Sequence, residues 1–423
     1  MDSVRYLLFI LSIMAYSLPA RAALYIDDIS GVKEGNGSRE APYHDLQYAI
    51  DHAADHDTLY ILPGQFSAEQ FAYPESLCGN CQEHKTKVKA SRGFMIKNKG
   101  LIIIGYSPDS TILITNAGYG VLFENSRQSE IRNLTITGGI RDYDGAATDA
   151  GIVARWSSVT ISGCVISDNT RRPDSIVVGI GGIIGREGSE LAIRGNSIIN
   201  NSWDGIALYR GATAYITDNI INGGRGAGIG VTWDATATIA GNKISNYWKG
   251  IGSFGDSRVI CSNNAVFDNL GWGIIATGTS YMDATNNVVN HNGNCGMAIW
   301  SDNCRGRFSN NIIMYNGWRE QWVCPCVGIW NTGSLFNFEI SYNDVWANKA
   351  GEYGDMPDYS DRNNNLQIVP IFADSINFIL SPESPLIDKG NPSITDPDGT
   401  ISDIGLGGGP RARRVVGDVK QRH

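Results

Sequence analysis

The sequence is poor in charge and in long apolar runs, and these two deficits exclude several classes of protein. Only 18% of its 423 residues are charged, and the formal net charge is −9, which argues against nucleic acid as a partner. Beyond the N-terminal region, no apolar run is long enough to span a bilayer, so we expect no transmembrane segment. Long stretches of helical periodicity are also few. The 50 glycines favour a turn-rich, all-β chain instead.

The first 22 residues have the pattern of an export signal. Arg5 supplies a positive charge, residues 6–16 form a short apolar run, and Ala20-Arg21-Ala22 fits a small-x-small cleavage site. We therefore expect residues 1–22 to be a signal peptide, and the protein to be secreted to the periplasm or the extracellular space.

A repeat of about 23 residues organises the middle of the chain. One mark is an Asn that recurs at Asn196, Asn219, Asn242, Asn264 and Asn287. A second mark, Gly before an apolar residue, recurs at Gly205, Gly228, Gly250, Gly273 and Gly296. The alternation of side chains after each Gly predicts a strand with one buried face, and two more short strands fit into each repeat. This pattern predicts a parallel β-helix with three strands per coil and an Asn ladder along the stack.

We expect residues 23–410 to form a single β-helix domain and the protein to be a monomer. Leu46, Ala49 and Ile50 fall on one face of a predicted amphipathic helix, which would cover the open end of the first coil. The predicted parts are an N-terminal cap (23–64), an irregular insertion (65–92), the coils (93–350), a C-terminal segment (366–410) and a basic, disordered tail (411–423).

Three insertions enlarge the same bend of the coil, at residues 138–150, 168–181 and 316–327. Insertions confined to one side of a repeat protein usually frame its binding surface. Between them we expect an open groove floored by coils with short bends.

Aromatic side chains project towards this predicted groove. Flat rings suit stacking on sugars, so we expect an elongated glycan to bind there, although each Trp could instead fasten a bend to its neighbours. The expected substrate-binding residues are Trp156, Trp203, Trp233, Trp248, Trp272, Trp300 and Lys249.

The repeats resemble those of the pectin-lyase-like superfamily of right-handed parallel β-helices. The start, LYIDDISGVKEGNGSREAPYHDLQYAIDHAADHDTLYILPGQF, and the end, FILSPESPLIDKGNPSITDPDGTISDIGLGGGP, resemble the terminal segments of secreted bacterial members. The resemblance implies an all-β, right-handed parallel β-helix and leaves the reaction open, because the superfamily includes lyases, epimerases, hydrolases and non-catalytic proteins. The chain has no Asp-Pro-His-Glu run of alginate epimerases and lacks the motif set of polygalacturonases.

A lyase must neutralise a uronate carboxylate and place a base beside the neighbouring proton. Arg155, Arg186 and Arg210 lie on successive predicted coils and could bind carboxylates. Tyr209 is the first candidate for the acid or base, and Lys249 is the second. Alternatively, the arginines could pair with Glu124 and Glu187 in a ladder of charges.

A glycoside hydrolase would instead need two carboxylates, which Glu187, Asp234 and Asp256 could supply. Turn capping explains the two Asp residues as well. The sequence favours a secreted polysaccharide lyase acting on an acidic polysaccharide. A non-catalytic glycan-binding surface protein and a glycoside hydrolase are the alternatives.

Eight cysteines occur in this chain, which we expect to be exported. By their places in the repeat, Cys164 and Cys261 should be buried thiols. We expect the others to form disulfides of undetermined connectivity: Cys78, Cys81, Cys295, Cys304, Cys324 and Cys326.

Asp396, Asp398 and Asp403 have the spacing of a Ca²⁺-binding loop without the complete pattern. Ordinary turn chemistry explains them equally well. We expect no organic cofactor.

Overall fold

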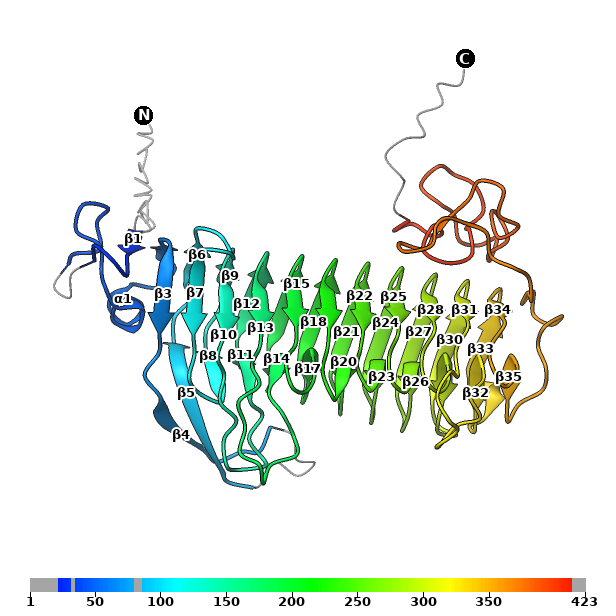
Figure 1. The fold of residues 1–423 in the computed structure, drawn as a ribbon, viewed down its shortest axis with the longest axis horizontal. Coiled ribbons are helices and arrows are strands. Elements are labelled where there is room, and N and C mark those ends of the chain that lie inside the picture. Colours follow the sequence, from blue (N-terminus) through cyan, green and yellow to red (C-terminus); the bar gives the residue numbers. More distant parts are fainter. Residues whose placement is uncertain (1–21, 32–34, 80–85, 413–423) are drawn as a thin grey trace, which may run out of the picture.

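The chain folds into one long stack of coils (Figure 1). The computed structural model describes residues 22–31, 35–79 and 86–412. The predicted signal peptide, apart from Ala22, lies outside these residues, as do Cys81 and most of the predicted basic tail. No helix in the described ranges is long and apolar enough to cross a membrane.

Each regular coil contributes one strand to each of three long sheets, named A, B and C here. Sheet A contains β1 (Ala23–Ile26), β2 (Thr58–Ile61), β6 (Ile102–Gly105), β9 (Ser129–Arg132), β12 (Ser158–Ser162), β15 (Glu190–Arg194), β18 (Thr213–Thr217), β21 (Thr236–Ala240), β24 (Arg258–Ser262), β27 (Tyr281–Thr285), β30 (Arg305–Ser309) and β33 (Phe338–Ser341). Sheet B contains β3 (Gly64–Ser67), β7 (Thr111–Ile114), β10 (Thr135–Thr137), β13 (Val165–Ser167), β16 (Ser197–Ile199), β19 (Ile220–Asn222), β22 (Lys243–Ser245), β25 (Ala265–Phe267), β28 (Val288–Asn290), β31 (Ile312–Met314) and β34 (Asp344–Trp346).

Sheet C is the third long sheet. It contains β4 (Phe71–Glu75), β5 (Val88–Lys97), β8 (Tyr119–Glu124), β11 (Ala150–Arg155), β14 (Gly181–Arg186), β17 (Ile206–Leu208), β20 (Ala227–Val231), β23 (Lys249–Ser253), β26 (Trp272–Ala276), β29 (Met297–Ile299), β32 (Ile329–Asn331) and β35 (Tyr353–Gly354). Its strands pair in parallel, except that β4 runs antiparallel to β5.

The predicted repeat sets the register of the coils. The apolar residues after the repeated glycines are partners in neighbouring strands of sheet C and point into the core: Ile206, Ile229, Ile251, Ile274 and Met297. The prediction of three strands per coil of about 23 residues is therefore confirmed.

The predicted Asn ladder runs along the bend between sheets A and B. Asn242 shows its chemistry: its Nδ2 donates to Oδ1 of Asn264 at 2.9 Å, and its Oδ1 accepts from the backbone N and Nδ2 of Asn219. Cys164 takes an Asn position, as predicted, and its backbone N donates to Asn196. A second ladder, which we did not predict, follows the bend between sheets B and C through Asn269, Asn292, Asn316 and Asn348. Both ladders satisfy backbone groups that would otherwise be buried without partners.

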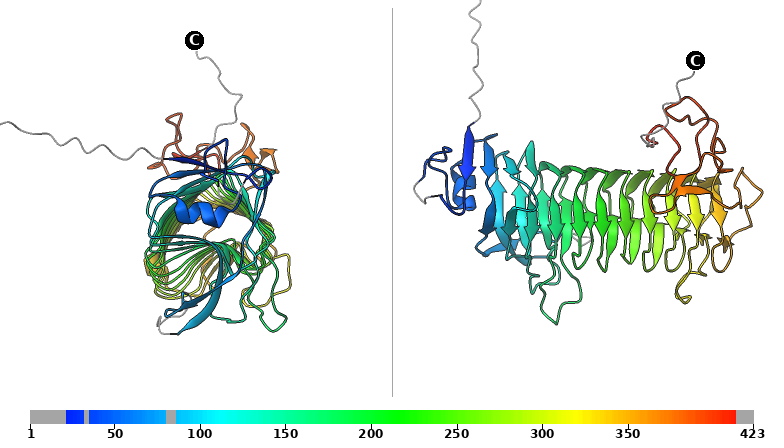
Figure 2. Two further views of the ribbon diagram at one scale, coloured as in Figure 1. Left: turned by 90° about the vertical axis from the view of Figure 1, so that its left-hand side faces the viewer. Right: turned by 45° about the horizontal axis from the view of Figure 1, so that its top comes forward.

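The N-terminal end is closed by a short helix, α1 (Leu46–His52), as the sequence predicted. Asp45 caps it by accepting a hydrogen bond from the Tyr48 backbone N. Leu46, Ala49 and Ile50 are buried against the first coil, so the helix covers the end of the core (Figure 2).

Residues 65–92, expected to be irregular, instead contain most of β3, β4 and the start of β5. β4 and β5 form an antiparallel hairpin that hangs below the N-terminal coils in Figure 1, beside the loops at 138–149 and 168–180. The loop at 315–328 projects on the same side near the other end. The insertions therefore lie on one side of the stack, as predicted.

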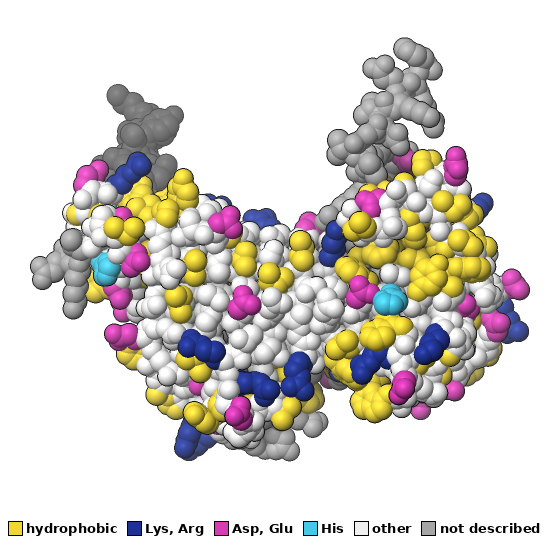
Figure 3. Space-filling model, in the orientation of Figure 1, with side chains coloured by type: hydrophobic (Ala, Val, Ile, Leu, Met, Phe, Trp, Pro, Cys, Tyr) yellow, Lys and Arg dark blue, Asp and Glu magenta, His cyan; other side chains and the backbone are white. Residues whose placement is uncertain are grey.

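The C-terminal segment returns along the coils and covers the outer face of sheet B. It includes the antiparallel pair β36 (Phe372–Asp374) and β37 (Ile379–Leu380), and a 3-10 helix, η1 (Leu335–Asn337), lies before it. Phe378, Leu386 and Ile404 pack on Val288 and Ile312. In Figure 3 this segment forms a raised, largely hydrophobic lobe at one end of the molecule.

Candidate active site

The outer face of sheet C is divided into a covered part and an open part. One outward-facing column of residues crosses every coil: Lys97, Glu124, Arg155, Arg186, Tyr209, Thr232, Phe254, Thr277 and Trp300. From Glu124 to Tyr209 these side chains are buried. Thr232, Phe254 and Thr277 are half-buried, and Trp300 is 40% exposed. The surface therefore opens after β17.

Arg155 and Arg186 lie in the covered part, where they are ion-paired. Arg186 is 0% exposed, and its Nη2 lies 2.6 Å from Oε1 of Glu75 on β4. Arg155 Nη1 lies 3.0 Å from the other Glu75 oxygen and 3.4 Å from Glu124. The expectation that these two arginines line an open groove is therefore wrong, because the β4–β5 hairpin lies over them.

Glu187 also belongs to this network, with Oε1 3.3 Å from Arg186 Nη1. The Tyr119 hydroxyl donates to Glu75 Oε1 and accepts from Arg186 Nη2, and burial raises the pKa of Tyr119 above the ordinary tyrosine value. The structure therefore shows the alternative arrangement, in which Arg155 and Arg186 pair with glutamates. The ladder is buried and not solvated.

A shallow depression marks the beginning of the open part. Its floor consists of small outward-facing residues, Ala207, Gly230 and Gly252, on β17, β20 and β23. The space above Gly230 is open: a Cβ there would meet only the Ala227 Cβ, at 3.5 Å. The Phe254 ring leans over Gly252 and closes one side.

Asp204, Tyr209 and Lys249 gather at this depression. Asp204 lies in the bend before β17, and its Oδ1 accepts a hydrogen bond from the Ala227 backbone N at 2.6 Å. The Tyr209 hydroxyl donates to the Asp204 carboxylate. Burial raises the pKa of Asp204 to about 6, although these hydrogen bonds and the Lys249 charge lower it. Asp204 therefore titrates near neutral pH.

Burial also lowers the pKa of Lys249, while the Asp204 carboxylate raises it. The ammonium lies 5.7 Å from the centre of the Phe254 ring and 5.9 Å from that of Trp272. An amine in this setting is a better proton acceptor near neutral pH than a solvated lysine.

Burial raises the pKa of Tyr209 well above its ordinary value, and the neighbouring Asp204 raises it further. The phenol therefore stays protonated at neutral pH. It can act as a hydrogen-bond donor but not as a base.

Arg210 follows Tyr209 and lies at the rim of the open part. Its guanidinium is 5.9 Å from the centre of the Trp233 ring. Its Nε and Nη2 atoms are buried and make no hydrogen bond within the described residues. The Nε atoms of Arg155 and Arg186 are unpaired in the same sense. Of the three predicted arginines, Arg210 is the one whose side chain is half-buried and not buried.

A tryptophan cluster continues the open face towards the C-terminal coils. Its rings lie in a chain of contacts with centroid distances of 5.2–6.4 Å, and its members are Trp248, Trp272, Trp300, Trp322 and Trp330. Trp272, a predicted ligand residue, is only 2% exposed and serves as the base of the cluster. Trp300 and Trp322, at 40% and 66% exposed, offer the accessible rings.

The other predicted ligand residues lie elsewhere. Trp156 is half-buried under the Arg155 guanidinium, 4.4 Å away, and Trp203 is half-buried in a bend between sheets B and C. Asp234 and Asp256 are exposed at the opposite edge of sheet C from Asp204, where Asp234 accepts a hydrogen bond from the Gly211 backbone N at 2.7 Å. The structure does not bring these two carboxylates to the depression.

Asp204 is the residue that the sequence analysis missed. The sequence does contain a signal for it. The residues directly before the repeated glycines on four successive coils are Asp204, Ala227, Lys249 and Trp272. In this column the small residue Ala227 separates Asp204 from Lys249. The pattern would have predicted that the carboxylate and the amine lie close together.

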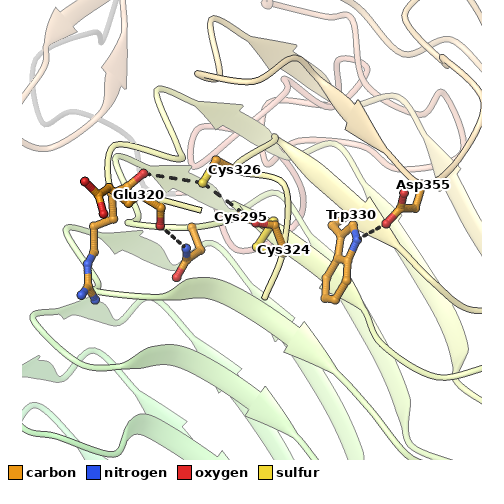
Figure 4. The surroundings of a disulfide bond; sticks show 8 residues. Cys295, Glu320, Cys324, Cys326, Trp330 and Asp355 are labelled. Atoms are coloured by element: carbon orange, nitrogen blue, oxygen red, sulfur yellow. Dashed lines mark hydrogen bonds between the residues drawn. A yellow bond between two sulfur atoms is a disulfide. The ribbon is translucent and has the colours of Figure 1, made fainter. Parts of the chain in front are cut away.

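The cysteine prediction is correct for some residues and wrong for others. Cys295 and Cys324 form a disulfide that joins the start of β29 to the loop carrying Trp322 (Figure 4). Cys78 is also disulfide-bonded. Cys164 and Cys261 are buried thiols, as predicted. Cys304 and Cys326 are free and buried, contrary to the prediction, with the Cys326 thiol facing the Arg319 carbonyl at 3.6 Å.

The predicted Ca²⁺ residues act as turn caps. Asp396 accepts from the backbone of Asp403 and Gly409, and Asp398 accepts from Thr400. Among the described residues, no group of three or more His, Cys, Asp or Glu side chains is placed to hold a metal ion. Ca²⁺ binding here stays a prediction without support from the geometry.

The family model described as "Right handed beta helix region" matches residues 80–244 and 181–345, together more than half of the chain. The chain belongs to this right-handed β-helix family. Its fold class is therefore confirmed in full.

Solved structures of other right-handed β-helices resemble the chain only distantly. The Azotobacter vinelandii mannuronan C-5 epimerase AlgE4 A-module is 13% identical, with 77% of this chain and 92% of that chain covered and a TM-score of 0.49. Pectate lyase Pel9A is 14% identical, with 91% and 95% covered and a TM-score of 0.47. A comparison with curated protein sequences found no significant match. These likenesses concern the fold of the family and carry no argument about the reaction.

Proposed function

We propose that this right-handed β-helix protein cleaves an acidic polysaccharide by β-elimination at the depression on sheet C. The observation that carries the proposal is the meeting of Asp204, Tyr209 and Lys249 beside an accessible aromatic surface. Functional sites commonly combine titratable groups of shifted pKa with an open, partly aromatic surface.

In this reaction, the neutral amine of Lys249 removes the proton from C5 of a uronate, next to its carboxylate. The electron pair of the C5–H bond forms a C4–C5 double bond, and the bond from C4 to the glycosidic oxygen breaks. The Lys249 ammonium then returns the proton to that oxygen. Atoms and charge balance without a further reactant.

Asp204 supports this cycle through its charge. Its carboxylate stabilises the ammonium that Lys249 becomes after taking the proton. Tyr209 is a positioning residue, because its hydroxyl donates to Asp204 and holds the carboxylate in place.

Arg210 supplies the second requirement of the reaction. Its half-buried guanidinium can pair with the uronate carboxylate, which makes the C5 proton easier to remove. Trp300 and Trp322 offer rings for neighbouring sugars to stack on, with the disulfide anchoring the loop that carries Trp322. We also propose that the protein works outside the cytoplasm, which the Cys295–Cys324 disulfide supports.

The test is a comparison of Lys249→Ala with the native chain on a uronate polymer. Loss of the amine should lower the rate of double-bond formation by about 100-fold or more, the usual contribution of a proton-transferring group. Lys389→Ala is the matched control, because Lys389 is exposed and lies in the C-terminal segment. Elimination that persists unchanged in Lys249→Ala would remove Lys249 from the mechanism. Glycan binding with no product in the native chain would favour the non-catalytic alternative.

A further inference from the structure

The depression lies next to the covered, N-terminal part of sheet C. On the next three coils beyond Tyr209 towards the N-terminus (β14, β11 and β8), the outward-facing side chains of sheet C are buried: Tyr119, Ala150, Leu122, Val153, Ile184, Glu124, Arg155 and Arg186. The residues that bury them come from the hairpin insertion, chiefly Glu75, Cys78, Val88 and Ala90.

The cover is packed closely over Arg186, which is 0% exposed. A Cβ built at Gly79 would lie 2.5 Å from the Arg186 Cδ, so the backbone there rests directly on the guanidinium side chain. Cys78, Val88 and Ala90 belong to the same buried cluster as Leu122, Val153 and Tyr209. The part of sheet C covered by the hairpin therefore begins at Tyr209, the residue that positions Asp204.

In the opposite direction, one outward-facing column stays partly exposed from β20 to β29, while Ile275 and Ala298 in the neighbouring column are buried beneath the tryptophan cluster. Neighbouring coils are about 4.8 Å apart, so the four steps from β17 to β29 span about 19 Å, the length of a short oligosaccharide. This path is bordered by Thr232, Phe254 and Thr277, which are half-buried, and by Trp300, which is 40% exposed.

We infer that the enzyme works from a chain end and releases short products, because the substrate can extend from the depression in one direction only. This inference rests on the proposed function and specifies how that site is used. An internal attack would require sugar residues on both sides of Lys249, and the hairpin occupies the N-terminal side.

The test follows viscosity and double-bond formation together, with the native chain acting on polygalacturonate, alginate and hyaluronan. On the polymer that is cleaved, we expect unsaturated mono- to trisaccharides from the first time point, with little loss of viscosity. Chemical capping of both polymer ends should abolish the reaction. A rapid fall in viscosity with long unsaturated products, or full activity on the capped polymer, would overturn this inference while leaving β-elimination intact. No unsaturated product on any polymer would instead overturn the proposed function.

A variant of the open path gives a second readout. Trp300→Ala should raise KM for tetrasaccharides several-fold more than KM for disaccharides, because only the longer substrates reach the far coils. Phe336→Ala is the aromatic control, since this side chain is fully exposed on η1. Equal effects of Trp300→Ala on both lengths would contradict a substrate that extends towards the C-terminal coils.

Discussion

The size of a single side chain decides whether the outer face of a β-helix leaves space for a ligand. Gly230 is the clearest case, because the hollow beside Lys249 exists only where this coil carries no side chain. The adjacent coils carry the small residues Ala207 and Gly252 at the equivalent position, and the coils two steps away carry Ile184 and Ile275.

Gly230→Leu should therefore block the site without harming the fold. Its backbone does not need a glycine conformation, and a Cβ there makes only an ordinary contact with Ala227. We expect the rate to fall by about 100-fold or more, since displacing a substrate by an ångström or so costs that much, with an unchanged melting temperature. Gly145→Leu, in open space on the 138–149 loop, is the control. Undiminished activity in Gly230→Leu would place the substrate elsewhere.

The pH dependence reports on the pair formed by Asp204 and Lys249. Activity should rise with pH, because Lys249 must lose its proton, and the midpoint should lie below that of an ordinary lysine, because burial lowers the pKa of Lys249. The Asp204 carboxylate raises the pKa of Lys249, so Asp204→Asn should move this midpoint to lower pH while reducing the maximal rate. A kcat/KM profile of both proteins measures the shift. An unmoved or upward-moved midpoint would show that the two groups are not coupled.

At the scale of elements, the repeat and its strands could be predicted because they depend on local alternation and on recurring marks. Asn196 and its successors showed the period, and the Leu46–Ile50 stripe showed the capping helix. The covering of Arg155 and Arg186 could not be predicted. It depends on a hairpin from residues 71–97, far away in the sequence, whose Glu75 carries no periodic signal.

The Asn ladder should be the main polar support of the stack. Asn242→Ala would remove the donor to Ile216 O and Asn264 Oδ1 and leave the Asn219 backbone N unpaired. Buried groups left without partners cost roughly 1–3 kcal/mol each, so we expect a loss of about 3–5 kcal/mol in the free energy of unfolding. Denaturant unfolding measures it, with the exposed Asn303→Ala as control. A loss below about 1 kcal/mol would mean that the ladder is dispensable.

On the scale of the whole molecule, the three sheets of the β-helix have three long outer faces, and other parts of the chain cover two of these faces in part. The C-terminal segment covers much of sheet B, and the hairpin covers the N-terminal part of sheet C. What remains of sheet C combines a half-buried amine, a carboxylate and exposed tryptophans within a few coils. This combination, and not the fold, is the reason to expect elimination chemistry.

The most direct test of that claim is the ultraviolet absorbance of C4–C5 unsaturated uronates, followed with the purified native chain on polygalacturonate, alginate and hyaluronan. Reducing ends are counted in the same samples. We predict that on one polymer absorbance and reducing ends rise together, one double bond for each new end. New reducing ends without absorbance would mean hydrolysis and would contradict the account, as would no change of either signal on all three polymers.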